Sequence, residues 1–281
     1  MVPAPLGQNF LAGEGWRGRI FSLLGARAGD IWLEIGAGHG EMTELLAGRA
    51  ARVIALELDA QLAAGLRKRA ANWPNVEVVE ADVLASDLAR IAGAPKFRIY
   101  GSIPYYITSP ILHRIYDTSA HIESAHLIMQ LEVAKRLAAK PGHREYGYLS
   151  VATQFYARPE ILLKIPPGAF RPQPKVDSAL VALRFPGPGA DLNLDDSAFL
   201  EFVQGCFAQK RKTLVNNLRG KLPSAKPARG SKRSKSNSNP LSNILRNAGI
   251  SERARAEELS LDQFAALHRI LNSKTNTTQT K

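Results

Sequence analysis

Apolar runs with strand character alternate with helix-forming runs along the first half of the chain. The expected strands cover residues 30–36, 52–58, 76–82, 96–102 and 124–130, and the expected helices cover 41–50, 60–73 and 133–140. Two strands that are separated by a helix usually pair in parallel within one sheet. The alternation therefore predicts an α/β fold with a doubly wound, mostly parallel sheet.

The segment from Ile161 to Phe185 breaks this alternation. It contains two strand-like runs that are joined by a proline-rich loop without a helix. Such a pair favours an antiparallel hairpin at one edge of the sheet. After Phe185 the run PGPGADLN is typical of a linker, and the chain then continues to the helical pattern LDQFAALHRIL. We therefore expect an α/β domain over residues 1–187 and a small helical domain over residues 188–281.

The size and composition of the chain exclude several classes of protein. Its 281 residues, 45% of them hydrophobic, are sufficient for a packed core. No apolar run is long enough for a membrane span, and the first residues lack the pattern of a secretory signal. We expect a soluble, cytoplasmic protein. Cys206 is the only cysteine, so we expect no disulfide framework, no metal site and a small buried side chain at this position.

Positive charge is concentrated in one part of the chain. The formal net charge is +12, and the interval between Glu201 and Glu252 contains eleven lysine and arginine residues but no acidic residue. Residues 201–222 have apolar residues at helical spacing, and residues 223–240 have the serine-rich and basic composition of a disordered loop. A basic surface can simply be solvated, but charge this concentrated favours contact with a nucleic acid. The candidate RNA-binding residues on the helical part are Lys210, Arg211, Lys212 and Arg219.

Glycines and acidic residues follow the first three expected strands. Gly36 and Gly38 belong to the run LEIGAGHGEM, where glycines allow a tight turn and a close approach of the backbone to a ligand. Glu57 ends the second strand, where a carboxylate can bind both hydroxyls of a ribose. Asp82 ends the third strand and can accept a hydrogen bond from an adenine amine. A glycine-rich turn alone is also compatible with a purely structural role, but three such strand ends together indicate a nucleoside site. We expect Glu57 and Asp82 to lie at exposed strand ends.

Two further acidic residues bear on the class of nucleotide. A dinucleotide site usually has its third glycine at position 41, and this chain has Glu41 there, which would repel a phosphate. Glu34 precedes the glycine turn and is also better suited to a cationic ligand. S-adenosylmethionine has a ribose, an adenine and a sulfonium but no phosphate. The acidic residues therefore favour this cofactor.

The run Ser-Ile-Pro-Tyr follows the fourth expected strand and should border the same crevice. An exocyclic amine of a base is a weak nucleophile, so its methylation requires acceptors that orient it toward the sulfonium methyl. Ser102 can offer a hydroxyl oxygen, and the rigid backbone around Pro104 can present a carbonyl. Tyr105 offers a ring face for the base to stack on, although most tyrosines are simply packing residues.

A series of motifs in this order resembles a known family. The motifs are GQNFL, LEIGAGHGEMT, ALELD, EADVL, GSIPYYITSPIL, MQLEVAKRL, YGYLSV, FRPQPKVDSALV and FAQKRKTLVNNL. They are similar to those of the ribosomal RNA adenine N6-dimethyltransferases, in particular the small-subunit enzymes, whose relatives include the erythromycin-resistance methylases and the mitochondrial transcription factor B proteins. The resemblance extends from Gly7 to about Leu271.

The resemblance implies a class I methyltransferase domain followed by a helical RNA-binding domain. The implied activity is the conversion of two adjacent adenosines near the 3′ end of small-subunit ribosomal RNA to N6,N6-dimethyladenosine, by a monomer that acts on the immature subunit. The implied base-stacking aromatics are Tyr105 and Phe170. The implied cofactor contacts are Asn9, Leu11, Gly36, Glu57, Asp82 and Ser102.

This sequence departs from the family pattern in three places. Ser102 stands where the family usually has asparagine, the basic segment that commonly precedes GQNFL is replaced by VPAPL, and residues 223–240 resemble an insertion that can supply charge for RNA. The serine leaves open an assembly factor with weak or lost methylation as an alternative. A DNA or protein methyltransferase with a related Pro-Tyr motif is a more remote alternative.

Overall fold

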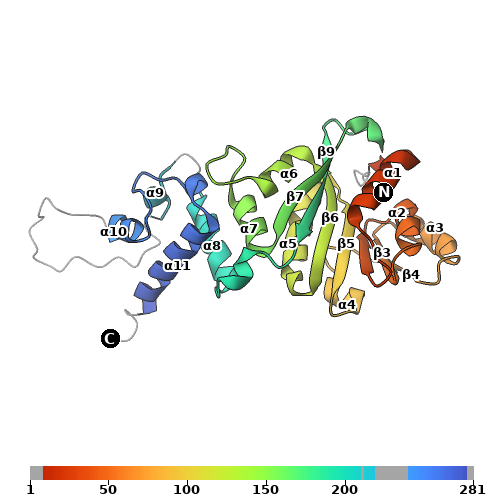
Figure 1. Cartoon of the computed structure of the whole chain (residues 1–281), viewed down its shortest axis with the longest axis horizontal. Helices are drawn as coiled ribbons and strands as arrows, with labels where there is room; N and C mark the ends of the chain where they lie inside the picture. Colours follow the sequence, from red (N-terminus) through yellow and green to blue (C-terminus); the bar gives the residue numbers. More distant parts are fainter. Residues whose placement is uncertain (1–8, 210–211, 219–239, 277–281) are drawn as a thin grey trace, which may run out of the picture. The chain divides into compact units, whose positions relative to one another are not determined.

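The computed structural model describes residues 9–209, 212–218 and 240–276, and the chain divides into two compact units (Figure 1). The first unit comprises residues 1–138 and 156–188, and the second comprises residues 139–155 and 189–281. The sequence predicts a single division after residue 187. The contacts assign residues 139–155 to the second unit, whereas the sequence placed them in the α/β domain.

The described residues of the first unit form a seven-stranded sheet, and the predicted fold class is confirmed. The strand order is β4-β3-β2-β5-β6-β9-β7. The first five strands are parallel, and β9 pairs antiparallel with both β6 and β7, as predicted for the edge hairpin. The strands are β2 (Ile31–Ile35), β3 (Arg52–Glu57), β4 (Val76–Glu80), β5 (Phe97–Ser102), β6 (Ile122–Gln130), β7 (Arg158–Ile165) and β9 (Ser178–Arg184).

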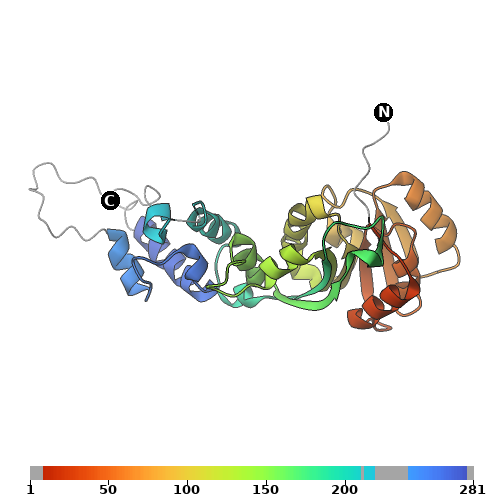
Figure 2. The same ribbon diagram turned by 90° about the horizontal axis from the view of Figure 1, so that it is seen from above.

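Helices lie on both sides of this sheet (Figure 2). They are α1 (Glu14–Leu24), α2 (Glu41–Ala47), α3 (Ala60–Ala70), α4 (Leu88–Ala92), α5 (Thr108–Asp117) and α6 (Leu131–Ala138). Helix α1 was not expected, because Gly15 and Gly18 are poor helix formers. It is held by burial of Ile20 and Leu24 in a core that also contains Trp32. Within the described ranges, no helix combines the length and the apolar character that a bilayer crossing requires.

The described part of the second unit is helical. It contains most of α7 (Tyr148–Tyr156), and α8 (Asp196–Cys206), α9 (Leu214–Leu218), α10 (Pro240–Asn247) and α11 (Leu261–Asn276). Residues 139–155 belong to it because Gly142 donates a backbone hydrogen bond to the Glu257 carbonyl at 2.8 Å, and Tyr146 Oη donates to the Leu259 carbonyl at 2.9 Å.

The helix expected across residues 201–222 is interrupted in the structure. Helix α8 ends at Cys206 and α9 begins at Leu214. The side-chain amide of Asn217 donates to the Cys206 carbonyl at 2.7 Å and so satisfies a carbonyl at the end of α8. Cys206 is buried, as predicted. Residues 223–239 of the predicted basic loop lie outside the described residues, and Pro240 begins α10.

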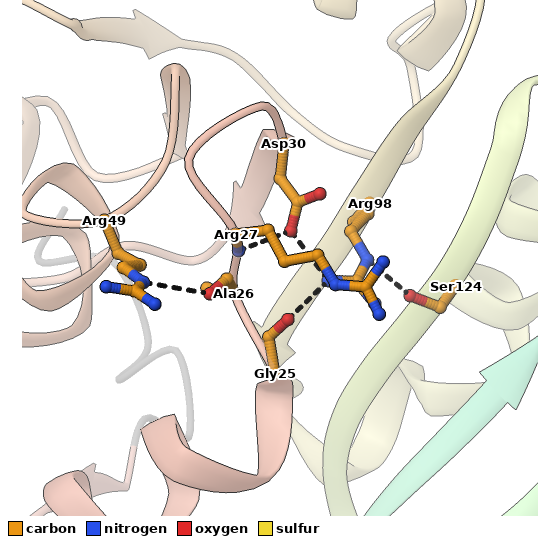
Figure 3. A network of polar contacts seen from close by, with 7 residues as sticks. All are labelled: Gly25, Ala26, Arg27, Asp30, Arg49, Arg98 and Ser124. Atoms are coloured by element: carbon orange, nitrogen blue, oxygen red, sulfur yellow. Dashed lines mark hydrogen bonds and ion pairs between the residues drawn. The ribbon is translucent and has the colours of Figure 1, made fainter.

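A polar network fixes the amino-terminal edge of the sheet (Figure 3). Arg98 on β5 forms an ion pair with Asp30 at 2.7 Å, and its Nε donates to Ser124 Oγ on β6 at 3.1 Å. It also donates to the carbonyl of Gly25, which follows α1, at 3.0 Å. The network joins β5 and β6 to the residues that precede β2 and follow α1, at the edge opposite the carboxyl ends of the parallel strands. Those carboxyl ends remain available for a ligand.

His126 makes the stability of this unit sensitive to acid. The side chain is 4% exposed beside Trp32, and burial, with smaller effects of Arg98 and Arg184, lowers its pKa from 6.5 to about 4. The unfolded chain binds this proton near pH 6.5 and the folded chain only near pH 4. The free energy of unfolding should therefore fall as the pH decreases across this window, by on the order of a few kcal/mol, and the full contribution of His126 should be present above the window.

Urea unfolding at about pH 7 and about pH 4.5 measures this effect. The variant His126→Gln has no proton to gain in this range, so its loss of stability between the two conditions should be smaller than that of the parent. Equal losses in the parent and the variant would assign the acid sensitivity to other groups.

Candidate functional site

The strand order reverses direction between β2 and β5, and two cavities lie at the carboxyl ends of these strands. From β2 the chain proceeds outward through β3 and β4, and it returns to the other side of β2 at β5. Ligands of doubly wound sheets bind at such a reversal. The larger cavity, here the Ser102 cavity, has a volume of about 100 Å³, and the smaller, here the Asp82 cavity, has about 70 Å³. Gly36 and Pro104 line both, so the two cavities adjoin.

Glu57 holds the glycine turn from within the structure. Its Oε2 accepts a hydrogen bond from the Gly38 backbone at 2.8 Å, and its Oε1 accepts one from the Asp59 backbone at 3.0 Å. The side chain is 2% exposed, so the expectation of an exposed strand end was wrong for this residue. The reason is that the turn folds back over the end of β3. Gly38 has φ 57°, and a Cβ there would lie 2.9 Å from the ring of Phe10, which explains the glycine.

Asp82 is exposed, as predicted, and lines the cavity that bears its name. Its Oδ1 accepts a hydrogen bond from the Leu84 backbone at 2.8 Å. Glu57 lines the same cavity, together with the exposed apolar side chains of Leu58 and Tyr106. Two carboxylates beside apolar surfaces match the hydroxyls and the flat base of a nucleoside.

The amino-terminal motif is attached to the FRPQP motif by a short pair of strands. Strand β1 (Phe10–Leu11) pairs antiparallel with β8 (Phe170–Arg171), with Leu11 opposite Phe170. Asn9, Leu11 and Phe170 all line the Ser102 cavity. Two motifs that lie about 160 residues apart in the chain thus contribute to one wall.

The Ser-Ile-Pro-Tyr run is held rigidly at the end of β5. Ser102 pairs with Ile128 of β6, and the Ile103 backbone donates to the Ile128 carbonyl at 3.0 Å. The Pro104 carbonyl accepts a hydrogen bond from the Ile107 backbone at 3.2 Å. Among the described residues no hydrogen bond to the Ile103 carbonyl or to Ser102 Oγ is found. These two oxygens, in residues that line the Ser102 cavity, are therefore available to accept hydrogen bonds from a ligand.

The two predicted aromatic residues line the same cavity but differ in exposure. Tyr105 is half-buried, and its hydroxyl is hydrogen-bonded to Ser178 Oγ at 2.5 Å, which fixes the ring. Burial raises the pKa of Tyr105, and the hydrogen bond to Ser178 opposes this shift. Phe170 is only 1% exposed and belongs to the hydrophobic core. Tyr105 is thus the more accessible surface for a base.

Glu34 lines the Ser102 cavity. It is 2% exposed, and Thr43 Oγ1 donates to its Oε2 at 2.6 Å. Burial is the main cause that raises the pKa of Glu34 from 4.5 to about 8; the hydrogen bond from Thr43 opposes this shift, and the negative charges of Glu41 and Glu57 add to it. The sequence marked Glu34 as an acidic group but gave no indication that its carboxyl group binds a proton near neutral pH.

Comparisons with known proteins agree with this geometry. A family model described as ribosomal RNA adenine dimethylase matches residues 4–267. The chain belongs to the ribosomal RNA adenine dimethylase family. This membership confirms the predicted enzyme class, which is adenine dimethylation of ribosomal RNA with S-adenosylmethionine as the cofactor.

Individual relatives of this dimethylase cover nearly the whole chain. It is 44% identical to ribosomal RNA small subunit methyltransferase A of Acidobacterium capsulatum, over 96% of this chain and 91% of the relative. The corresponding protein of Myxococcus xanthus is 38% identical over 98% of this chain and 92% of the relative. The structure is similar to that of the 23S rRNA methyltransferase ErmE, with a TM-score of 0.69 and 30% identity over 94% of this chain and 100% of the other. It is also similar to a dimethyladenosine transferase from Plasmodium falciparum, with a TM-score of 0.79 and 25% identity over 95% of this chain and 98% of the other.

The predicted RNA-binding residues of the dimethylase lie in its second unit. Lys212 is exposed in the segment between α8 and α9, where its backbone donates to the Gln209 carbonyl at 3.0 Å. Lys210, Arg211 and Arg219 lie outside the described residues. The Ser102 cavity also contains Arg17, which the sequence did not single out because α1 itself was not expected.

Proposed function

We propose that this dimethylase transfers methyl groups from S-adenosylmethionine to N6 of two adjacent adenosines near the 3′ end of small-subunit ribosomal RNA. The product is N6,N6-dimethyladenosine. The observation that carries the proposal is the convergence of Glu57, Asp82 and the Ser-Ile-Pro-Tyr run on two adjoining cavities. The names of the relatives from Acidobacterium capsulatum and Myxococcus xanthus support the small subunit as the substrate. We further propose that the protein is monomeric and cytoplasmic and that it acts on the immature small subunit.

The residues present fit the cofactor. Each oxygen of Glu57 accepts one backbone hydrogen bond and retains a lone pair for a ribose hydroxyl. The Oδ2 atom of Asp82 has no partner among the described residues and is available to an adenine amine. Asn9, Leu11 and the glycine turn line the Ser102 cavity, which adjoins the Asp82 cavity. The cofactor supplies an activated methyl group when bound.

The chain contributes orientation and electrostatics to the reaction. The Ser102 hydroxyl and the Ile103 carbonyl accept hydrogen bonds from the target amine, so that its lone pair is drawn out of conjugation with the ring. The ring of Tyr105 stacks on the target base and is kept in place by Ser178. The buried surroundings of these groups, with Ile103 2% and Phe170 1% exposed, exclude water from the reacting atoms.

We assign the capture of RNA to the second unit. Lys212 is exposed, and Lys210, Arg211 and Arg219 lie close to it in the sequence. The acid-free interval that contains them has the charge required for contacts with phosphates. The basic residues of the interval 223–240 add to the same electrostatic attraction.

A methylation assay tests the proposed function. The protein is incubated with labelled S-adenosylmethionine and small ribosomal subunits that lack the modification, and the RNA is then digested to nucleosides. We expect label in N6,N6-dimethyladenosine. Binding to the subunits without label in adenosine would instead support the assembly factor with lost methylation, and label in DNA or protein only would overturn the RNA substrate.

Tyr105 provides the matched test of base stacking. Tyr105→Ala should lower turnover by about tenfold to a hundredfold, because a stacked base contributes about 1 to 3 kcal/mol. Tyr105→Phe keeps the ring and loses only the bond to Ser178, so its turnover should fall much less. Affinity for S-adenosylhomocysteine, measured by calorimetry, should stay the same in both. Parental turnover in Tyr105→Ala would contradict the stacking role. Phe170 is less suitable for this test, because truncation of a buried phenylalanine costs about 3 to 5 kcal/mol of stability.

A further inference from the structure

Arg17 is a cation inside the Ser102 cavity that none of the assigned roles uses. It belongs to α1, which packs against α2, and these two helices lie side by side in Figure 1. The side chain is partly buried and lines the cavity together with Glu34 and Glu41. In the described part of the chain its guanidinium forms no ion pair and no hydrogen bond. A guanidinium in a concave, partly buried position is a site for an anionic group of the ligand.

The position of Arg17 restricts which anionic group that is. Helix α2 begins directly after the glycine turn and packs against α1, and Arg17 lines the same cavity as Gly36, Gly38 and Met42. The nucleoside residues Glu57 and Asp82 line the other cavity. The part of S-adenosylmethionine that extends from the nucleoside is an amino acid, with one ammonium and one carboxylate group.

The charges around Arg17 match such a zwitterion. The cavity has one cation, Arg17, and one carboxylate, Glu41, which also forms no ion pair among the described residues. The raised pKa of Glu34 leaves its carboxyl group largely protonated near neutral pH. An aminocarboxylate can present its carboxylate to the cation and its ammonium to the Glu41 carboxylate. A phosphate of RNA at the same place would face the Glu41 carboxylate without an ammonium to offset it.

From this arrangement we propose that Arg17 binds the carboxylate of the amino-acid part of the cofactor, and so determines preference for the complete cofactor over shorter nucleosides. The inference rests on the proposed function for the class of cofactor. It adds a charged contact from α1, a helix that carries none of the motifs from which the family was recognised. Arg17 binds through its bidentate guanidinium, whose geometry suits a carboxylate better than a lysine does.

The test compares two ligands that differ only in the part that Arg17 is proposed to contact. S-adenosylhomocysteine has the aminocarboxylate, and 5′-methylthioadenosine has the same nucleoside thioether without it. Calorimetric titration of Arg17→Gln should give about tenfold to a hundredfold weaker binding of S-adenosylhomocysteine, and unchanged binding of 5′-methylthioadenosine. Arg17→Lys keeps the charge and should lie between the parent and Arg17→Gln.

Arg19 supplies the matched control on the same helix. It is exposed, lies over the ring of Trp16 at 5.8 Å, and does not line either cavity. Arg19→Gln should therefore leave both affinities at parental values. Equal weakening of the two ligands in Arg17→Gln, or no weakening of either, would overturn the proposal, and loss of RNA binding alone would assign Arg17 to the RNA. Failure of the parent protein to bind S-adenosylhomocysteine would instead count against the proposed cofactor.

Discussion

Replacing Glu57 with glutamine should weaken binding of S-adenosylhomocysteine by about one to two orders of magnitude. The carboxylate accepts hydrogen bonds from the backbones of Gly38 and Asp59 and also lines the Asp82 cavity, where we propose that the ribose binds. A glutamine has only one acceptor oxygen, and its amide nitrogen would meet one of these two backbone donors. The variant thus loses a charged acceptor for the ribose and one of the bonds that shape the glycine turn.

Glu80 is the control for this substitution. It pairs in register with Glu57 on the neighbouring strand, but it is exposed and forms an ion pair with Arg67 at 3.1 Å. Surface ion pairs of this kind contribute about 1 kcal/mol or less. Glu80→Gln should therefore change neither cofactor affinity nor stability appreciably. Calorimetry that gave Glu57→Gln the affinity of the parent would remove Glu57 from the cofactor site.

The strands and the glycine turn were predictable because their signals are local. The apolar runs that became β2, β3, β4, β5 and β6 are bounded in the sequence by turn residues, and parallel pairing follows from the helices between them. The edge hairpin followed from the lack of a helical pattern in one segment. The position of Glu57 and Asp82 at one cavity was predictable for the same reason, since parallel strands bring their carboxyl ends to one edge.

The features that were not predicted depend on contacts between distant segments. The burial of Glu57 results from the glycine turn folding over the end of β3, which residue type does not reveal. Helix α1 owes its stability to the core around Trp32, not to the propensity of its own residues. The break after Cys206 depends on the side chain of Asn217, eleven residues further along the chain. Arg17 lines the cavity because α1 carries it there, and no sequence motif marks this residue.

Replacement of Ser102 should change the rate of methyl transfer with much less change in cofactor affinity. The backbone of Ser102 is paired with Ile128, and the next residue is fixed by its own hydrogen bond to the Ile128 carbonyl. The backbone therefore has little freedom to move toward the target amine, and we expect the short serine hydroxyl to align this amine less closely than a longer side chain would. Misplacement of reacting groups by about 1 Å can cost on the order of a hundredfold in rate.

From this geometry we expect Ser102→Asn to raise the rate and Ser102→Ala to lower it, because an asparagine oxygen extends further into the cavity and alanine has no acceptor. Single-turnover rates on unmethylated small subunits measure the chemical step without product release, and calorimetry of S-adenosylhomocysteine checks that the cofactor site is intact. A slower Ser102→Asn enzyme with parental cofactor affinity would mean that the cavity has adapted to serine and that asparagine displaces the base. Equal rates for the parent and Ser102→Ala would deny this side chain any part in the reaction. The Ile103 carbonyl, which is fixed in place by the Ile103 hydrogen bond to β6 and by the following proline, would then be the acceptor that orients the amine.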